Sequence, residues 1–247
     1  MICFGPRSGS TLLCGLLAAT GVAGRPGSHF HGASLDRWRA AHGLSGRSFT
    51  CRRDALRAVF DAARAAGTGN AGLFGLRMQG EGFGFFRSQL AILHPGKLSD
   101  AARIEAEFGR TLFIHLVRPD KLDQAISYVR ADQTGLWHRN ADGTELERLA
   151  PPAEPHFDPD AIARRVIDLS ARDAAWAEWF AAEGVEPLRV GYEDLSADPR
   201  GTLERVLAAL GLDPAAARAV EPPTAKLADA MSKDWRRRFE ADTGHER

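Results

Sequence analysis

The chain of 247 residues has no surplus of charge of either sign and very little cysteine. Its 32 Lys and Arg residues are balanced by 32 Asp and Glu residues. Nucleic-acid-binding domains usually carry a basic patch or stripe, so this balance argues against such a partner. The three cysteines, Cys3, Cys14 and Cys51, have no metal-ligand spacing. Because a sparse, odd cysteine count is typical of a reducing compartment, we expect a cytoplasmic protein without a metal site.

The sequence also lacks a long apolar run. No segment approaches the roughly 20 residues of a membrane-spanning helix, so we do not expect stable membrane insertion. Residues 11–24 are small and apolar and could pass for a signal-peptide core. However, only Arg7 precedes them as a charge, and Leu13 stands before Cys14, where a lipoprotein signal needs a small residue. We interpret the segment as a helix of one domain over residues 1–247.

Residues 6–11 (PRSGST) are the most informative segment of the chain. They follow the apolar residues 2–4 and precede the apolar residues 12–17, which is the pattern of a strand, a glycine-bearing loop and a helix. Such a helix start directs several free backbone N–H groups and the positive end of the helix dipole to one point, which binds phosphate or sulfate. Gly5 and Gly9 allow a close approach of the backbone, and Ser10 and Thr11 add hydroxyl donors.

This loop lacks the lysine of a Walker A motif, G-x-x-x-x-G-K-[ST], because Ser10 follows Gly9. Arg7 instead supplies a positive charge, with a planar guanidinium that suits oxyanions. The missing lysine argues against an ordinary ATPase or GTPase. A second interpretation is a Ser/Gly turn that caps a helix and holds no ligand.

A second segment points to the same edge of the fold. Residues 112–117 (LFIHLV) have the composition of a buried parallel strand, and Arg118-Pro119-Asp120 ends it. The periodicity of the following residues predicts a helix over 121–131, with Gln124, Ser127 and Ala131 opposite its apolar side. Arg118 is thus expected at the carboxyl end of a strand, where open α/β sheets bind ligands. Ser127 follows nine residues later. A surface arginine and a solvated serine are the alternative.

Together the two segments resemble the sulfotransferases that use 3′-phosphoadenosine 5′-phosphosulfate (PAPS). In that superfamily a similar loop holds the 5′-phosphosulfate, and an arginine followed nine residues later by a serine holds the 3′-phosphate. The resemblance implies a donor site that needs no metal. Its predicted residues are Arg7, Ser8, Gly9, Ser10 and Thr11 for the 5′-phosphosulfate, and Arg118 and Ser127 for the 3′-phosphate, with Arg7 also acting in catalysis.

The match extends to one bacterial branch and covers nearly the whole chain. Residues 6–13, 19–24 (ATGVAG), 124–127 (QAIS), 133–137 (QTGLW) and 232–235 (SKDW) look like the trehalose 2-sulfotransferase family. The resemblance implies sulfation of a hydroxyl on a carbohydrate or glycolipid acceptor, and a homodimer.

One stretch departs from that family. After residues 22–24 the trehalose enzymes resemble G-E-P-x-E-F-F, and one of those glutamates is taken as the general base. Here Arg25 and Ser28 stand at the two glutamate positions, as in relatives assigned to lipopolysaccharide sulfation. His29 and His31 then become the candidate bases, because neutral imidazole accepts protons near pH 7. We favour His31, since the adjacent Gly32 leaves backbone room. A structural or acceptor-binding role is the alternative for both.

The rest of the chain alternates predicted strands with predicted helices. Residues 73–78 and 188–192 are further candidate strands. Helices are predicted over residues 54–66, 83–93, 100–108, 160–182 and 202–210. Such alternation predicts an α/β fold, a P-loop-like parallel sheet with right-handed crossovers and flanking helices, as in sulfotransferases. Residues 140–158 are rich in proline and are predicted to be a loop that covers the acceptor site or forms a dimer contact.

Two segments have less definite predicted roles. Residues 226–238 are basic, and the resemblance implies that Lys226 and Trp235 close over the adenine or the 3′-phosphate. A solvated amphipathic helix is the alternative there. Arg77 and Gln79, after the candidate second strand, are placed by topology to face an acceptor.

Two other functional classes compete with a sulfotransferase. One is a P-loop kinase or nucleotidase acting on ATP, which dependence on Mg²⁺ would favour. The other is a nucleotide-binding protein in which the lost glutamates mean lost catalysis.

Overall fold

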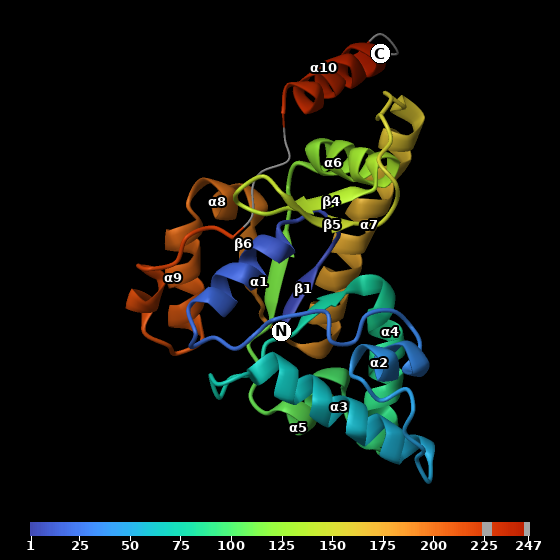
Figure 1. The fold of residues 1–247 in the computed structure, drawn as a ribbon, viewed down its shortest axis with the longest axis vertical. Coiled ribbons are helices and arrows are strands. Elements are labelled where there is room, and N and C mark those ends of the chain that lie inside the picture. Colours follow the sequence, from blue (N-terminus) through green and yellow to red (C-terminus); the bar gives the residue numbers. More distant parts are fainter. Residues whose placement is uncertain (224–228, 245–247) are drawn as a thin grey trace.

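The computed structural model describes residues 1–223 and 229–244 (Figure 1). A four-stranded sheet lies at its centre, with strand order β2-β1-β3-β6 and all neighbours parallel. From β1 (Ile2–Phe4) the chain crosses to β2 (Arg77–Gln79) and returns to β3 (Ile114–Val117) on the other side. The order therefore reverses between β1 and β3, and the loops after these strands lie beside each other, where open sheets bind ligands.

Alternate strand residues face two separate apolar cores. Ile2, Phe4 and Leu116 pack on one side with α1 (Ser10–Ala19) and α9 (Pro199–Ala209). On the other side, Cys3 and Met78 pack with α4 (Gly80–Leu93) and α7 (Pro159–Glu183). The strand β6 (Leu188–Gly191) completes the sheet, and α3 (Arg52–Thr68) packs against α4. Because both faces of the sheet are covered, β1 is a continuous apolar run, and β3 is apolar except for the buried His115.

A further layer covers the carboxyl ends of the strands. The helix α6 (Lys121–Thr134) packs against α7 and α10 (Ala230–Gly244). The hairpin of β4 (Leu136–Arg139) and β5 (Glu145–Arg148) follows it directly, and Figure 1 shows it between α6 and the sheet. The reversal at Gly135 needs glycine: its φ is +69°, and a Cβ there would lie 2.4 Å from the Ala150 carbonyl oxygen.

The predicted α/β class and parallel sheet are confirmed. The predicted strands and helices are present, although β2 begins only at Arg77, because residues 73–76 join the sheet through a single bridge between Gly27 and Leu76. The predicted loop over residues 140–158 was wrong for residues 145–148, which form β5. The other elements are α2 (Leu35–Ala41), α5 (Asp100–Phe108), α8 (Tyr192–Ala197) and a 3₁₀ turn (Pro214–Ala217).

Within the described ranges, no helix combines the length and apolar character needed to cross a membrane.

Candidate active site

The loop after β1 is a tight turn that aims the first turn of α1 at one point. Gly9 is the N-cap of α1 with φ +87°, and a Cβ on it would lie 2.7 Å from the Tyr192 ring. Ser8 is buried and donates to the Gly5 carbonyl at 2.7 Å. Arg7 has φ +62°, and no other non-glycine residue in the described ranges has a positive φ. Strained backbone of this kind is concentrated at functional sites.

Arg7 is partly buried, and its two hydrogen-bond partners in the described part of the chain are neutral. Its Nε donates to the Ser127 hydroxyl at 3.0 Å, and its Nη1 donates to the Trp137 carbonyl. Among residues 1–223 and 229–244, no acidic side chain forms an ion pair with it. Burial lowers the pKa of Arg7 to about 10, and the nearby Arg118 charge contributes to the lowering. A partly buried cation that is hydrogen-bonded only to neutral groups is stabilised by an anion that binds to it.

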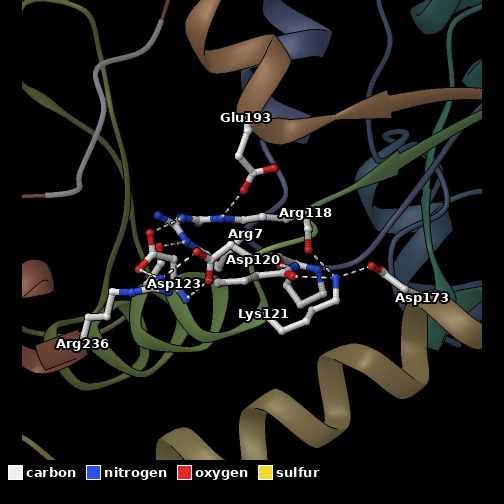
Figure 2. Close-up of polar contacts among 11 residues, drawn as sticks. Arg7, Arg118, Asp120, Lys121, Asp123, Asp173, Glu193 and Arg236 are labelled. Carbon is white, nitrogen blue, oxygen red and sulfur yellow. Dashed lines mark hydrogen bonds and ion pairs between the residues drawn. The ribbon is translucent and has the colours of Figure 1, made fainter. Parts of the chain in front are cut away.

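Arg118 ends β3 next to Arg7 but has acidic neighbours (Figure 2). Its side chain is 8% exposed. The Nε atom lies 3.6 Å from a Glu193 carboxylate oxygen, and Nη2 lies 3.7 Å from Asp123. Neither contact is a hydrogen bond, and Nε is buried with no hydrogen-bond partner. The guanidinium also stacks 4.3 Å from the centre of the Tyr192 ring. Arg118 therefore has unused donor capacity at the strand end.

The start of α6 is tied to α10 by charge. Arg236 donates to Asp120 at 2.6 Å and to Asp123 at 2.9 Å (Figure 2). Burial alone would raise the pKa of Asp120, but the Asp123 backbone N–H and the Arg236 guanidinium outweigh it and lower that pKa. Asp120 also caps α6. The C-terminal helix is thus bound to the same helix start that positions Arg118 and Ser127.

A second polar cluster surrounds the Thr11 hydroxyl in the first turn of α1. Arg77 Nη1 donates to Thr11 Oγ1 at 3.0 Å, and its Nε donates to the Ser28 hydroxyl at 2.8 Å. The His138 Nε2 lies 3.1 Å from the same Thr11 oxygen. Ser28, at one of the missing glutamate positions, therefore faces this cluster through Arg77. The first turn of α1, the start of β2 and the hairpin all contribute to this polar cluster.

The structure brings together Arg7, Ser127, Thr11 and Arg118, all predicted from the sequence. Gln124 was predicted opposite the buried side of α6, yet it is fully buried and donates to the Pro6 carbonyl at 2.7 Å. It thereby connects α6 to the loop after β1. No feature of the sequence indicates this contact.

Neither of the predicted bases, His29 and His31, belongs to the polar cluster around Thr11. His29 Nε2 is 3.2 Å from the Arg25 carbonyl oxygen, and its ring packs 5.8 Å from Phe74. His31 is exposed. In the described part of the chain, no hydrogen bond or ion pair joins either ring to Arg7, Thr11 or Arg118. A catalytic role for His29 or His31 stays a prediction.

Trp235 is 3% exposed and packs edge-on against Phe157 at 5.9 Å, among apolar residues of α6 and α7. Its predicted role over the nucleotide stays a prediction. Lys226 lies outside the described residues.

Sequence reasoning missed His138 and the Trp137 carbonyl, because it did not predict the hairpin that presents them. The Asp142-Gly143 pair was an available signal, since Asp-Gly is common at hairpin turns. The structure has such a turn: the Asn140 N–H donates to the Thr144 carbonyl at 2.9 Å, and Gly143 has φ +85°.

No group of three or more His, Cys, Asp or Glu side chains suited to a metal ion occurs within residues 1–223 and 229–244.

The chain is similar to several known proteins. A trehalose 2-sulfotransferase of Mycobacterium tuberculosis is 28% identical over 256 residues, covering 96% of this chain and 92% of that protein. The trehalose 2-sulfotransferase of Mycolicibacterium smegmatis is 37% identical over 131 residues, which cover 53% of this chain and 46% of that protein. The sulfotransferase domain of the Synechococcus PCC 7002 olefin synthase is similar over 96% of this chain and 92% of that domain, with 19% identity and a TM-score of 0.43. The family model of the Stf0 sulphotransferases matches residues 1–242, and the chain belongs to this family of sulfotransferases.

Proposed function

We propose that this sulfotransferase moves the sulfuryl group of PAPS to a hydroxyl of a carbohydrate or glycolipid. The observation that carries the proposal is the partly buried Arg7, which follows β1 and, within residues 1–223 and 229–244, has the neutral Ser127 hydroxyl and Trp137 carbonyl as its hydrogen-bond partners. A second, under-used arginine, Arg118, follows the neighbouring strand. Two cationic positions at adjacent strand ends suit a donor that carries anionic groups at both its 5′ and 3′ positions.

In this proposal each anion has its own protein partners. The backbone N–H groups at Ser8, Gly9, Ser10 and Thr11, together with Arg7, bind the 5′-phosphosulfate. Arg118 and Ser127 bind the 3′-phosphate. Arg7 donates to the Ser127 hydroxyl in this structure. When PAPS binds, Arg7 donates to the 5′-phosphosulfate instead, and the Ser127 hydroxyl becomes available to the 3′-phosphate. Lys226 and Trp235 are proposed at the nucleotide end of the site, as the family resemblance implies.

Sulfuryl transfer depends mainly on the positioning of the reactants and on stabilisation of the negative charge that develops. Sulfuryl transfer resembles phosphoryl transfer: the acceptor oxygen attacks sulfur in line with the leaving phosphate oxygen, and fixed donors stabilise the negative charge. Arg7 and Arg77 supply such donors on either side of Thr11. The acceptor hydroxyl must also lose a proton, and a positioned base contributes about 10²–10⁴-fold. His31 and His29 are the bases predicted from the sequence.

The proposed acceptor, a carbohydrate or glycolipid hydroxyl, is inferred from the relatives of this chain. The two curated relatives are named for sulfation of trehalose at its 2 position. Arg25 and Ser28 replace the glutamates of that family, so we propose a carbohydrate hydroxyl without restricting it to trehalose. We further propose that the protein acts in the cytoplasm and as a homodimer.

A transfer assay tests the proposed function. The protein is incubated with ³⁵S-labelled PAPS and a set of acceptors that includes trehalose, other disaccharides, a glycolipid and a polysaccharide. Labelled sulfate ester that forms with EDTA present supports the proposal. A protein that transfers phosphate from Mg-ATP, and no sulfate from PAPS, would be a kinase. Nucleotide binding with no transfer to any acceptor would support the non-catalytic alternative.

A further inference from the structure

His138, on β4, lies against the first turn of α1, where the predicted anion site begins. Its Nε2 is 3.1 Å from the Thr11 hydroxyl oxygen. The backbone carbonyl of Trp137, the preceding residue, accepts from Arg7. The hairpin therefore brings one titratable ring to the point that Arg7 and the loop after β1 surround.

Three charged side chains and one neutral hydroxyl, each from a different segment, face this imidazole. Arg7 comes from the loop after β1, and Arg77 from β2 donates to the same Thr11 oxygen at 3.0 Å. Glu147 comes from the paired strand β5, with a carboxylate oxygen 3.4 Å from Nε2. Thr11, from α1, is the neutral neighbour. Two cations and one carboxylate thus set the charge state of the ring.

Arg77 can only donate, so the Thr11 oxygen accepts from it and keeps its own proton to donate. In the tautomer that carries its hydrogen on Nδ1, His138 Nε2 accepts this proton. Burial, together with Arg7 and Arg77, lowers the pKa of His138 to about 4, so the ring is neutral at pH 7. An unprotonated Nε2 then faces the site.

We infer that His138 is the catalytic base that takes the proton of the acceptor hydroxyl. The inference rests on the proposed function, since it requires a sulfuryl donor on the loop after β1. When donor oxygens engage Thr11, its hydroxyl donates to them and releases Nε2. A hydroxyl of the acceptor then donates to Nε2 in place of Thr11.

The transfer balances with His138 as its proton acceptor. The acceptor O–H bond breaks and its proton passes to Nε2, while the acceptor oxygen forms a bond to sulfur. The bond between sulfur and the bridging phosphate oxygen breaks, and the nucleotide leaves with that electron pair. The resulting imidazolium faces Glu147 at 3.4 Å, and the carboxylate stabilises the positive charge that forms there. Glu147 is therefore a positioning residue.

The first test needs no acceptor. The His138 imidazole C–H signal is followed by NMR against pH, with and without adenosine 3′,5′-bisphosphate, and is assigned by its loss in His138→Gln. An opposite charge within about 4–6 Å shifts a pKa by about 1–3 units. Bound bisphosphate should therefore raise the pKa of His138 by at least about one unit. A curve unmoved by saturating bisphosphate overturns the inference, whichever acceptors the enzyme uses.

The second test is kinetic, with ³⁵S-labelled PAPS and the best acceptor of the panel. His138→Gln should lower kcat by about 10²–10⁴-fold, with unchanged affinity for the bisphosphate. Glu147→Gln should lower kcat less and should lower the pKa of His138 in the complex. The exposed Arg200, at the start of α9, supplies the control Arg200→Ala, which should transfer like the wild type.

The two tests distinguish failure of the proposed function from failure of the inference about His138. If the wild type binds no bisphosphate, the proposed function fails. If the wild type binds bisphosphate and His138→Gln transfers at the wild-type rate, the inference about His138 fails alone. Greater loss in Glu147→Gln than in His138→Gln would make the carboxylate the base. Loss confined to His31→Ala or His29→Ala would return the role to those residues.

Discussion

Arg7 and Arg118 follow neighbouring strands of the sheet, yet one has neutral partners and the other has acidic ones. Arg7 donates to a hydroxyl and a carbonyl, whereas Arg118 lies 3.6 Å from Glu193 and 3.7 Å from Asp123. An anion that binds Arg7 gains a partly buried charge interaction and displaces no ion-paired carboxylate. An anion that binds Arg118 competes with the carboxylates of Asp123 and Glu193. We therefore expect Arg7 to supply most of the donor affinity and Arg118 to discriminate between nucleotides.

The largest expected effect comes from Arg7→Ala. Removing this partly buried cation should weaken the binding of the bisphosphate by at least about 100-fold, or about 2.7 kcal/mol, because hydrogen bonds to charged groups contribute about 1.5–3 kcal/mol each. Isothermal titration calorimetry with adenosine 3′,5′-bisphosphate measures it, with Arg200→Ala on the exposed side of α9 as a control. Near-normal affinity would contradict the dominance of Arg7.

The next effect concerns stability and pH, because Arg7 and Arg77 also act on His138. Its pKa is about 4 in the folded chain and about 6.5 when unfolded, so the unfolded state binds more protons between these values. The contribution of neutral His138 to the free energy of unfolding is fully present above pH 6.5 and is lost as the pH falls toward 4.

Denaturant unfolding of the wild type and His138→Asn at several pH values checks it. Between pH 6.5 and 4, the free energy of unfolding of the wild type should fall by up to about 3 kcal/mol more than that of the variant. The lowered pKa values of His29 and His115 act in both proteins and cancel in the comparison. Parallel curves would mean that His138 is not held neutral.

Ser127→Ala sharpens the comparison between the two arginines. If Ser127 serves the 3′-phosphate, the variant should weaken the bisphosphate by about fivefold to tenfold and leave 5′-AMP unaffected, since a typical hydrogen bond contributes about 1 kcal/mol. Calorimetry with both nucleotides measures it. Equal losses for the two nucleotides would show that the serine acts instead by holding Arg7.

The smallest expected effect comes from Glu193→Gln. The carboxylate is half-exposed and 3.6 Å from Arg118, and such pairs contribute about 0–1 kcal/mol. Neutralising it should tighten the binding of the bisphosphate about twofold and leave that of 5′-AMP unchanged, because the proposed function assigns Arg118 to the 3′-phosphate alone. Weaker bisphosphate binding would mean that Glu193 positions Arg118 rather than competing for it.

The sequence predicted the sheet because its strands are short apolar runs with charged or glycine-bearing ends, and both anion motifs could be read from those ends. It did not predict the hairpin, because prolines at 151, 152 and 155 obscured the Asp142-Gly143 turn. His138 was missed for the same reason. The burial of Gln124 and the acidic setting of Arg118 depend on which elements pack together, and local patterns carry no information on that.

Thermal unfolding with adenosine 3′,5′-bisphosphate, 5′-AMP and Mg-ATP, each with and without EDTA, tests the central claim most directly. A ligand at 100 times its Kd adds about 2.7 kcal/mol, and each kcal/mol raises the Tm of a chain of this size by about 2–4 °C. A donor site of two arginines at adjacent strand ends predicts the largest rise with the bisphosphate, unaffected by EDTA. A rise with Mg-ATP alone that EDTA abolishes would contradict it.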